Sequence, residues 1–320
     1  MKTGKLPNKL LKDIILNELA KNRSEVILRP RIGEDCSVLD FGEYACVLSC
    51  DPITGTANEI GRLAVHVSCN DIASCGVEPI GLLVTILCPE NGTLEELKKI
   101  TDQLNEAASS INIDILGGHT EVTNAVNRYV LTCTAVGRCL KGEFISTSGA
   151  KPGDELVLTK HAGLEGTAII AFEKEKELIE VFGSELVETA KSYMDNISVV
   201  KDGIISAKFG AHAMHDVTEG GVLGAVWEMC EASGTGVRID AGMIPVTGPT
   251  EKICAFYNIN PLKLISSGCM LIATADGNSL VKELSKNGIP AAIIGKMDSG
   301  PERIVNIDGS AEIIEPPAED

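Results

Sequence analysis

The segment Ile60–Pro79 constrains the fold of this chain most, because its pattern predicts a helix that is buried on more than one side. Gly76 supplies a left-handed stop, and Pro79 prevents the helix from resuming. At about 100° per residue the side chains form two apolar faces, which are Ile60, Ala64 and Val67 with Asp71 at the end, and Val65, Cys69 and Ile72. We therefore expect other elements to cover this helix on most sides.

Asp71 occupies an unfavourable position in this predicted helix. It lies near the C-terminal end, where the helix dipole repels a carboxylate and burial further disfavours its charge. Arg62 lies too far back along the helix to compensate. A metal ion is one candidate for the missing positive charge. The alternative is that Asp71 reaches solvent at a frayed helix end.

Further acids recur beside glycines and at the ends of apolar runs. Asp35 follows a Gly-Glu pair in a turn before a strand, Asp51 closes an apolar run, and Asp216 opens a predicted helix. Carboxylates in such places suggest convergence on a hard cation. Magnesium holds phosphates in this way, with few protein ligands and several waters.

Glycine pairs accompany these acids. Gly220 and Gly221 would let a phosphate approach the N–H groups of a helix that is capped by Asp216 or Thr218. The alternative is a capped helix whose glycines allow tight packing. The run 117–121, Gly-Gly-His-Thr-Glu, is predicted to be a loop.

Two histidines and one cysteine are open candidates for chemistry. His119 and His161 lie in predicted loops and could contact substrate or transfer a proton, although a structural role is favoured for each. Cys36 follows two acids, whose charge would raise the pKa of its thiol and lower its reactivity. Whether Cys36 takes part in chemistry is left open.

The composition excludes several classes of function. The chain has 320 residues with a net charge of −17, which argues against nucleic acid and against an anionic membrane surface. No apolar run approaches the ~18 residues of a membrane helix, and the N-terminus lacks a signal-peptide pattern. The 11 cysteines form no C-x-x-C pair, as expected of core thiols in a reducing compartment. We expect a cytoplasmic protein.

The chain divides most readily at residues 146–154, a polar stretch containing Gly and Pro. This predicts domains at 1–148 and 149–320, each an α+β or α/β unit that mixes strands and helices. Helices are expected near 7–21, 93–111, 163–174, 184–209, 216–232 and 278–287, and strands near 45–51, 80–87, 114–116, 129–137, 155–159, 211–215, 269–274, 291–295 and 303–307. Neither a P-loop nor a Rossmann glycine motif is present.

The ordered set of motifs resembles the aminoimidazole ribonucleotide (AIR) synthase-like ATP-binding superfamily. The set consists of Gly33-Glu34-Asp35, Asp51, Asn70-Asp71-Ile72-Ala73 with Gly76 and Pro79, Gly117-Gly118-x-Thr120, Lys151-Pro152-Gly153-Asp154, and Asp216-x-Thr218-x-Gly220-Gly221. Each motif is common alone, but their order from about residue 30 to 295 is specific. The Lys151 linker and the Asp216 motif are most similar to those of HypE-like members, which serve hydrogenase maturation.

The resemblance implies a two-domain architecture in which the N-terminal sheet pairs across a homodimer and the second domain is α/β. It implies ATP and Mg2+ as cofactors. Under this assignment the metal ligands are Asp35, Asp51, Asp71 and Asp216; the nucleotide contacts are Gly33, Gly117, Gly118, Thr120, Thr218, Gly220 and Gly221; and the catalytic candidates are His119 and Glu121.

The implied chemistry is activation of an oxygen by phosphoryl transfer from ATP to a small-molecule or protein-borne acceptor. One alternative is a nucleotide-binding accessory protein of hydrogenase-type maturation with little turnover. Another is an unrelated acidic metal-binding hydrolase. HypE proteins end in a cysteine that carries the reacting group, whereas this sequence ends in Pro317-Ala318-Glu319-Asp320. We therefore expect that the chain does not itself carry a carbamoyl group.

Overall fold

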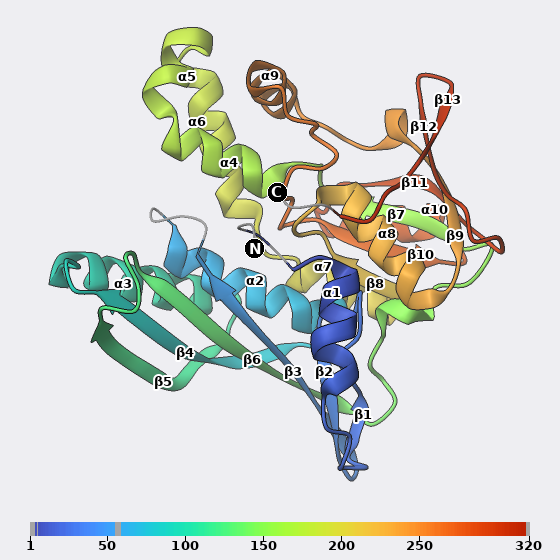
Figure 1. Cartoon of the computed structure of the whole chain (residues 1–320). Coiled ribbons are helices and arrows are strands. Elements are labelled where there is room, and N and C mark those ends of the chain that lie inside the picture. The colour runs from blue at the N-terminus through green and yellow to red at the C-terminus, as the bar shows by residue number, and fades with distance from the viewer. Residues whose placement is uncertain (1–3, 5, 55–58, 318–320) are drawn as a thin grey trace.

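The computed structural model describes residues 4, 6–54 and 59–317, and it contains two β-sheets, each with its own helices (Figure 1). The first sheet has the order β1-β2-β3-β6-β4-β5. Its strands are β1 Val26–Leu28, β2 Ser37–Phe41, β3 Tyr44–Ile53, β4 Pro79–Pro89, β5 Asp114–Thr123 and β6 Val130–Leu140. All neighbours are antiparallel except β4 and β5, which are joined through a helix as a parallel crossover.

Two helices cover one face of this sheet, namely α2 Ile60–Ser74 and α3 Leu94–Ser110 (Figure 1). Helix α3, which the sequence predicts near 93–111, begins at a complete capping box formed by Thr93 and Glu96. Large apolar side chains on the opposite face are exposed, including Leu83 on β4 and Leu116 on β5.

The second sheet has the order β13-β12-β9-β11-β7-β10-β8 and is antiparallel except for β9 and β12. Its strands are β7 Glu155–Thr159, β8 Ala213–Asp216, β9 Gly236–Asp240, β10 Met270–Thr274, β11 Ala291–Asp298, β12 Arg303–Ile307 and β13 Ser310–Ile313. Its helices are α4 Leu164–Glu173, α5 Glu175–Phe182, α6 Ser184–Ser192, α7 Val200–Phe209, α8 Gly221–Ser233, α9 Gly248–Tyr257 and α10 Gly277–Lys286. The mixed helix and strand content of both halves confirms the predicted fold class.

Helix α2 lies between the first sheet and the C-terminal half and contributes side chains to the cores of both (Figure 1). Ala64 and Ile72 belong to the core beneath the first sheet, whereas Leu63 belongs to the core of the C-terminal half. Gly76 has φ +71°, the left-handed conformation predicted for the helix stop. The expectation that α2 is buried on most sides is confirmed.

The predicted helix 184–209 is wrong as a single element. Helix α6 ends at Ser192, and α7 starts only at Val200. Buried Asn70 of α2 explains the break, because its side chain donates to Ile197 O (2.9 Å) and accepts from Val199 N (2.8 Å). These backbone groups are therefore satisfied outside a helix.

Two other predicted elements differ from the structure. The run 117–121 is not a loop but part of the exposed edge strand β5. At the N-terminus, helical turns continue from α1 Asn8–Leu10 through Glu18, but no residue of these turns is buried. None of the helices in the described part of the chain is long and apolar enough to cross a membrane.

Candidate metal and nucleotide site

Four carboxylates meet near the C-terminal end of α2. Asp71 comes from α2, Asp51 from β3, Asp35 from the turn before β2, and Asp216 from the end of β8. Burial, followed by the charges of Asp216, Asp51 and Asp35, raises the pKa of Asp71 well above its ordinary value. Asp71 is only 6% exposed. The alternative in which it reaches solvent at a frayed helix end is therefore wrong.

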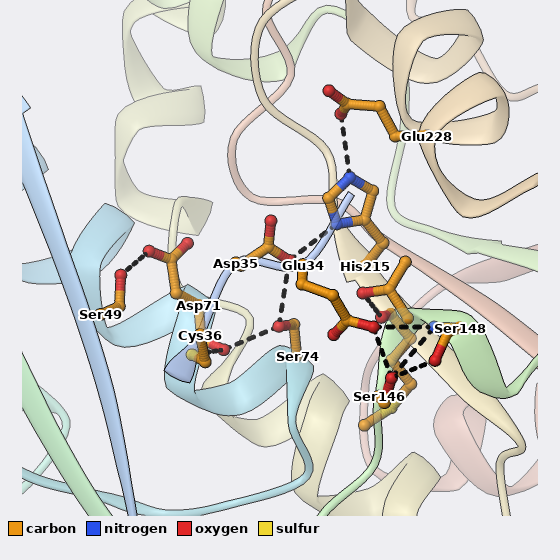
Figure 2. A network of polar contacts seen from close by, with 12 residues as sticks. Glu34, Asp35, Cys36, Ser49, Asp71, Ser74, Ser146, Ser148, His215 and Glu228 are labelled. Atoms are coloured by element: carbon orange, nitrogen blue, oxygen red, sulfur yellow. Dashed lines mark hydrogen bonds and ion pairs between the residues drawn. The ribbon is translucent and has the colours of Figure 1, made fainter. Parts of the chain in front are cut away.

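Hydrogen bonds hold one oxygen of three of these acids and leave the other oxygen uncommitted. The Ser49 hydroxyl lies within hydrogen-bonding distance of Oδ2 of Asp71 and of Oδ2 of Asp51, the latter at 3.0 Å. Oδ2 of Asp35 accepts from the Ser74 hydroxyl at 3.3 Å (Figure 2). Among the described residues, no donor bonds the Oδ1 atom of any of these three acids.

Asp216 is the acid of the cluster that combines burial with a lack of hydrogen-bond partners among the described residues. It is 1% exposed, and neither of its carboxylate oxygens has a hydrogen-bond partner among the described residues. Burial and then the charge of Asp35 raise its pKa well above the ordinary value. A buried carboxylate without partners is costly unless a cation or a proton neutralises it.

A positively charged group that the sequence analysis missed lies beside the cluster. The His215 ring contacts Asp35 through Nδ1 (2.7 Å) and Glu228 through Nε2 (3.1 Å), as Figure 2 shows. Burial lowers the pKa of His215, but the two carboxylates outweigh it and raise that pKa well above the ordinary value. Glu228 comes from α8, so no local spacing in the sequence indicates this contact.

The donor set of the cluster fits a hard divalent cation. Asp35, His215 and Asp216 each place one possible ligand atom within 4.8 Å of the others. Both ring nitrogens of His215 already face carboxylate oxygens, so the atoms that remain available as metal ligands in this cluster are carboxylate oxygens. Magnesium prefers oxygen ligands of this kind and keeps several waters. The residues present therefore fit Mg2+.

The turn that carries Asp35 is held by α8 on one side and by the segment that joins the two halves on the other. Gly33 has φ +78°, and a Cβ atom there would lie 2.7 Å from the carbonyl oxygen of Glu228, so only glycine fits this approach. Glu34 accepts hydrogen bonds from Ser148 N (3.2 Å) and from the Ser146 hydroxyl. The structure thus gives Gly33 a packing role, and its predicted nucleotide contact stays a prediction.

The predicted anion site at the start of α8 differs from the structure. The N-cap is Gly220 and has no side-chain cap hydrogen bond, so the prediction that Asp216 or Thr218 caps this helix is wrong. The N–H groups of Gly221 and Gly224 already donate to Thr218 O and Gly220 O. Few free donors remain there for a phosphate, and nucleotide contact by Thr218, Gly220 and Gly221 stays a prediction.

The predicted catalytic pair lies apart from the four acids within one chain. His119 Nε2 and Glu121 Oε2 are 3.1 Å apart on β5, and both side chains are largely exposed. Strands β6 and β4 separate β5 from β3, which carries Asp51. Neighbouring strands are about 4.8 Å apart, and β5 lies three such spacings from β3. Gly117, Gly118 and Thr120 occupy the same edge strand.

Two other sequence candidates are more buried than expected. Cys36 is 2% exposed and its thiol donates to Asp71 O at 3.2 Å. Burial and its neighbours raise the pKa of the Cys36 thiol well above its ordinary value. His161 packs edge-on against Tyr193, with ring centroids 4.7 Å apart. Both observations favour structural roles.

A cavity of about 360 Å³ opens beside the acids and is lined by Asp35, Cys36 and Ser49 among others. A larger cavity of about 990 Å³ lies between α2, α3 and α7, and none of the four acids lines it. The smaller cavity therefore reaches Asp35 alone of the four acids, and the larger one belongs to a different part of the molecule.

Comparison with known proteins agrees with this architecture. The sequence model described as AIR synthase related protein, N-terminal domain, matches residues 33–139, and the model of the corresponding C-terminal domain matches residues 151–308. A putative hydrogenase expression/formation protein of Methanocaldococcus jannaschii is 28% identical over 279 residues, which cover 84% of this chain and 80% of that protein. Carbamoyl dehydratase HypE of Cupriavidus necator is 28% identical over 234 residues, covering 72% of this chain and 64% of that protein.

Solved structures share the fold over nearly the whole chain. A chain in the crystal structure of a HypE–HypF complex superposes with a TM-score of 0.79 at 23% identity, covering 96% of this chain and 99% of that chain. HypE in complex with ATP superposes with a TM-score of 0.69 at 18% identity, covering 96% and 93%. Because both halves match in sequence and in fold, the chain belongs to the AIR synthase related protein family.

Proposed function

We propose that this protein is an ATP- and Mg2+-dependent enzyme that activates an oxygen atom of its acceptor by phosphoryl transfer. The observation that carries the proposal is the meeting of four acids, each with an uncommitted carboxylate oxygen, around buried Asp216. Such a cluster is stable with a bound cation and unfavourable without one. Relatives of the HypE type and the structure of HypE with ATP support a nucleotide as the second component.

The four acids share one role in this proposal. Asp35, Asp51, Asp71 and Asp216 would hold magnesium, which neutralises charge on the phosphates of ATP when bound. Ser49 and Ser74 orient the acids by donating to them. The reaction breaks the bond between the β–γ bridging oxygen and the γ-phosphorus of ATP and forms a bond from that phosphorus to the acceptor oxygen, so that ADP leaves.

The acceptor is proposed to be a small molecule or a protein-borne group. Relatives named for hydrogenase formation and for carbamoyl dehydration favour a carbamoyl oxygen on a partner protein. The accessory alternative, in which nucleotide binds with little turnover, rests on the exposure of His119 and Glu121 away from the acids within one chain. A homodimer that brings these residues of one subunit to the acids of the other would remove this separation.

Turnover distinguishes the two candidates. The full chain is incubated with ATP and Mg2+, with and without a partner protein that a carbamoyltransferase has loaded with a carbamoyl group from carbamoyl phosphate, and ADP is quantified by chromatography. We expect ADP release that Asp71→Asn lowers at least about a hundredfold, while the exposed-acid control Asp114→Asn does not. ATP binding without ADP release under either condition would favour the accessory role and contradict the enzymatic one.

A further inference from the structure

We propose that Glu228 and His215 are positioning residues that orient the metal ligand Asp35 from the C-terminal half of the chain. This inference rests on the proposed magnesium site and adds to it the means by which the C-terminal half controls that site. The three side chains form a continuous row in Figure 2, from α8 through β8 to the turn before β2. His215 is 2% exposed and Glu228 is 4% exposed, so water competes little with these contacts.

The geometry makes His215 a support for the site rather than a metal ligand. An imidazole nitrogen has one in-plane direction for a hydrogen bond or a metal. Nδ1 faces Asp35 Oδ2 at 2.7 Å, and Nε2 faces Glu228 Oε2 at 3.1 Å. Both directions are therefore occupied by protein oxygens, although His215 lies close enough to Asp35 and Asp216 to complete a three-residue metal cluster.

The same contacts give the two carboxylate oxygens of Asp35 different roles. His215 and Ser74 both bind Oδ2, which leaves Oδ1 as the oxygen available for a cation. Contacts of this kind commonly change metal affinity 10- to 100-fold when they are removed. Without His215, the Asp35 side chain would keep only the longer 3.3 Å contact with Ser74.

Helix α8 supports this turn at two points, which links metal affinity to the docking of the two halves. The carbonyl oxygen of Glu228 lies 2.7 Å from the position that a Cβ of Gly33 would take, and the Glu228 side chain reaches Asp35 through His215. A shift of α8 relative to the first sheet would therefore move both contacts together. We therefore expect the affinity for the metal to depend on how α8 docks against the first sheet.

The test measures binding of Mn2+ alone, as a spectroscopic substitute for Mg2+, by the electron paramagnetic resonance signal of the free ion. We expect Glu228→Ala to weaken Mn2+ binding about 10- to 100-fold. Glu228→Gln keeps an acceptor oxygen for Nε2 and should restore most of the affinity. His215→Asn keeps a donor near the Nδ1 position and should likewise bind better than His215→Ala. His212→Ala is the matched control, since His212 pairs with Asp154 (2.9 Å) outside the cluster.

A second readout needs no variant. Electron spin echo spectra of the Mn2+-loaded wild-type protein should lack the coupling of a directly bound imidazole nitrogen. Such a coupling would overturn the positioning role by making His215 a ligand, and equal Mn2+ affinity in Glu228→Ala and wild type would also overturn it. A wild-type protein that binds no Mn2+ would instead contradict the metal site of the proposed function and this inference with it.

Discussion

At the scale of single residues, the buried acids explain why the site needs a cation. Asp216 has no hydrogen-bond partner among the described residues, and its pKa is raised by burial and by Asp35. When the folded-state pKa of an acid is raised, the folded protein binds the proton more tightly than the unfolded chain does. Stability then falls as the pH rises above the ordinary value of 3.8, until the folded-state pKa is passed.

The substitution Asp216→Asn should therefore stabilise the metal-free protein. We expect a gain of about 1–3 kcal/mol near neutral pH, which shrinks as the pH falls toward about 4, where Asp216 is protonated in the unfolded chain as well as in the folded protein. The measurement is thermal unfolding in a chelator between about pH 5 and pH 8, with Asp114→Asn as an exposed control. A destabilised Asp216→Asn protein under these conditions would mean that the Asp216 charge is already compensated.

Residue patterns in the sequence indicated the acids but not the side chains that hold them in place. The burial of α2 could be predicted from its apolar faces, although solvent exposure of Asp71 at a frayed helix end stayed an open alternative, and the acids at Asp35, Asp51 and Asp216 stand out beside glycines and apolar runs. His215 could not be predicted to reach Asp35, since 180 residues separate them and only the docking of β8 against α2 brings them together.

At the scale of elements, α2 organises both halves through its buried side chains. Asn70 bonds Ile197 O and Val199 N, which lie in the break between α6 and α7. The capping box of α3 and the stop at Gly76 were predictable because they are local. The break before α7 was not, because its cause is a side chain from another element.

The substitution Asn70→Ala should destabilise the protein by about 2–4 kcal/mol, since it leaves one buried N–H and one buried C=O without partners. Chemical denaturation monitored by circular dichroism measures this loss. Asn105→Ala on the exposed face of α3 serves as the control and should change stability little. Equal stability of the Asn70→Ala and wild-type proteins would show that this contact does not hold α7.

At the scale of the whole molecule, the uncovered face of the first sheet favours assembly. Leu83 and Leu116 are 45% and 50% exposed on the neighbouring strands β4 and β5. Apolar groups on an open sheet face usually pack against another surface. The homodimer implied by the family resemblance is a natural occupant and remains a prediction.

The substitution Leu83→Arg should weaken a dimer that uses this face by at least about tenfold, because it places a charge in an apolar contact. Light scattering at micromolar concentration should give twice the monomer mass for the wild type and a lower mass for the variant. Met243→Arg, at an exposed apolar site of the C-terminal half, is the control. A monomeric wild-type protein would exclude this assembly.

The central claim is that the four acids hold magnesium and thereby bind ATP. Isothermal titration of ATP into the full chain, with Mg2+ and with a chelator, tests this claim most directly. We expect saturable binding with Mg2+ that is at least about tenfold weaker in the chelator and in Asp71→Asn, but not in Asp114→Asn. ATP affinity that is unchanged by the chelator and by Asp71→Asn would contradict the account.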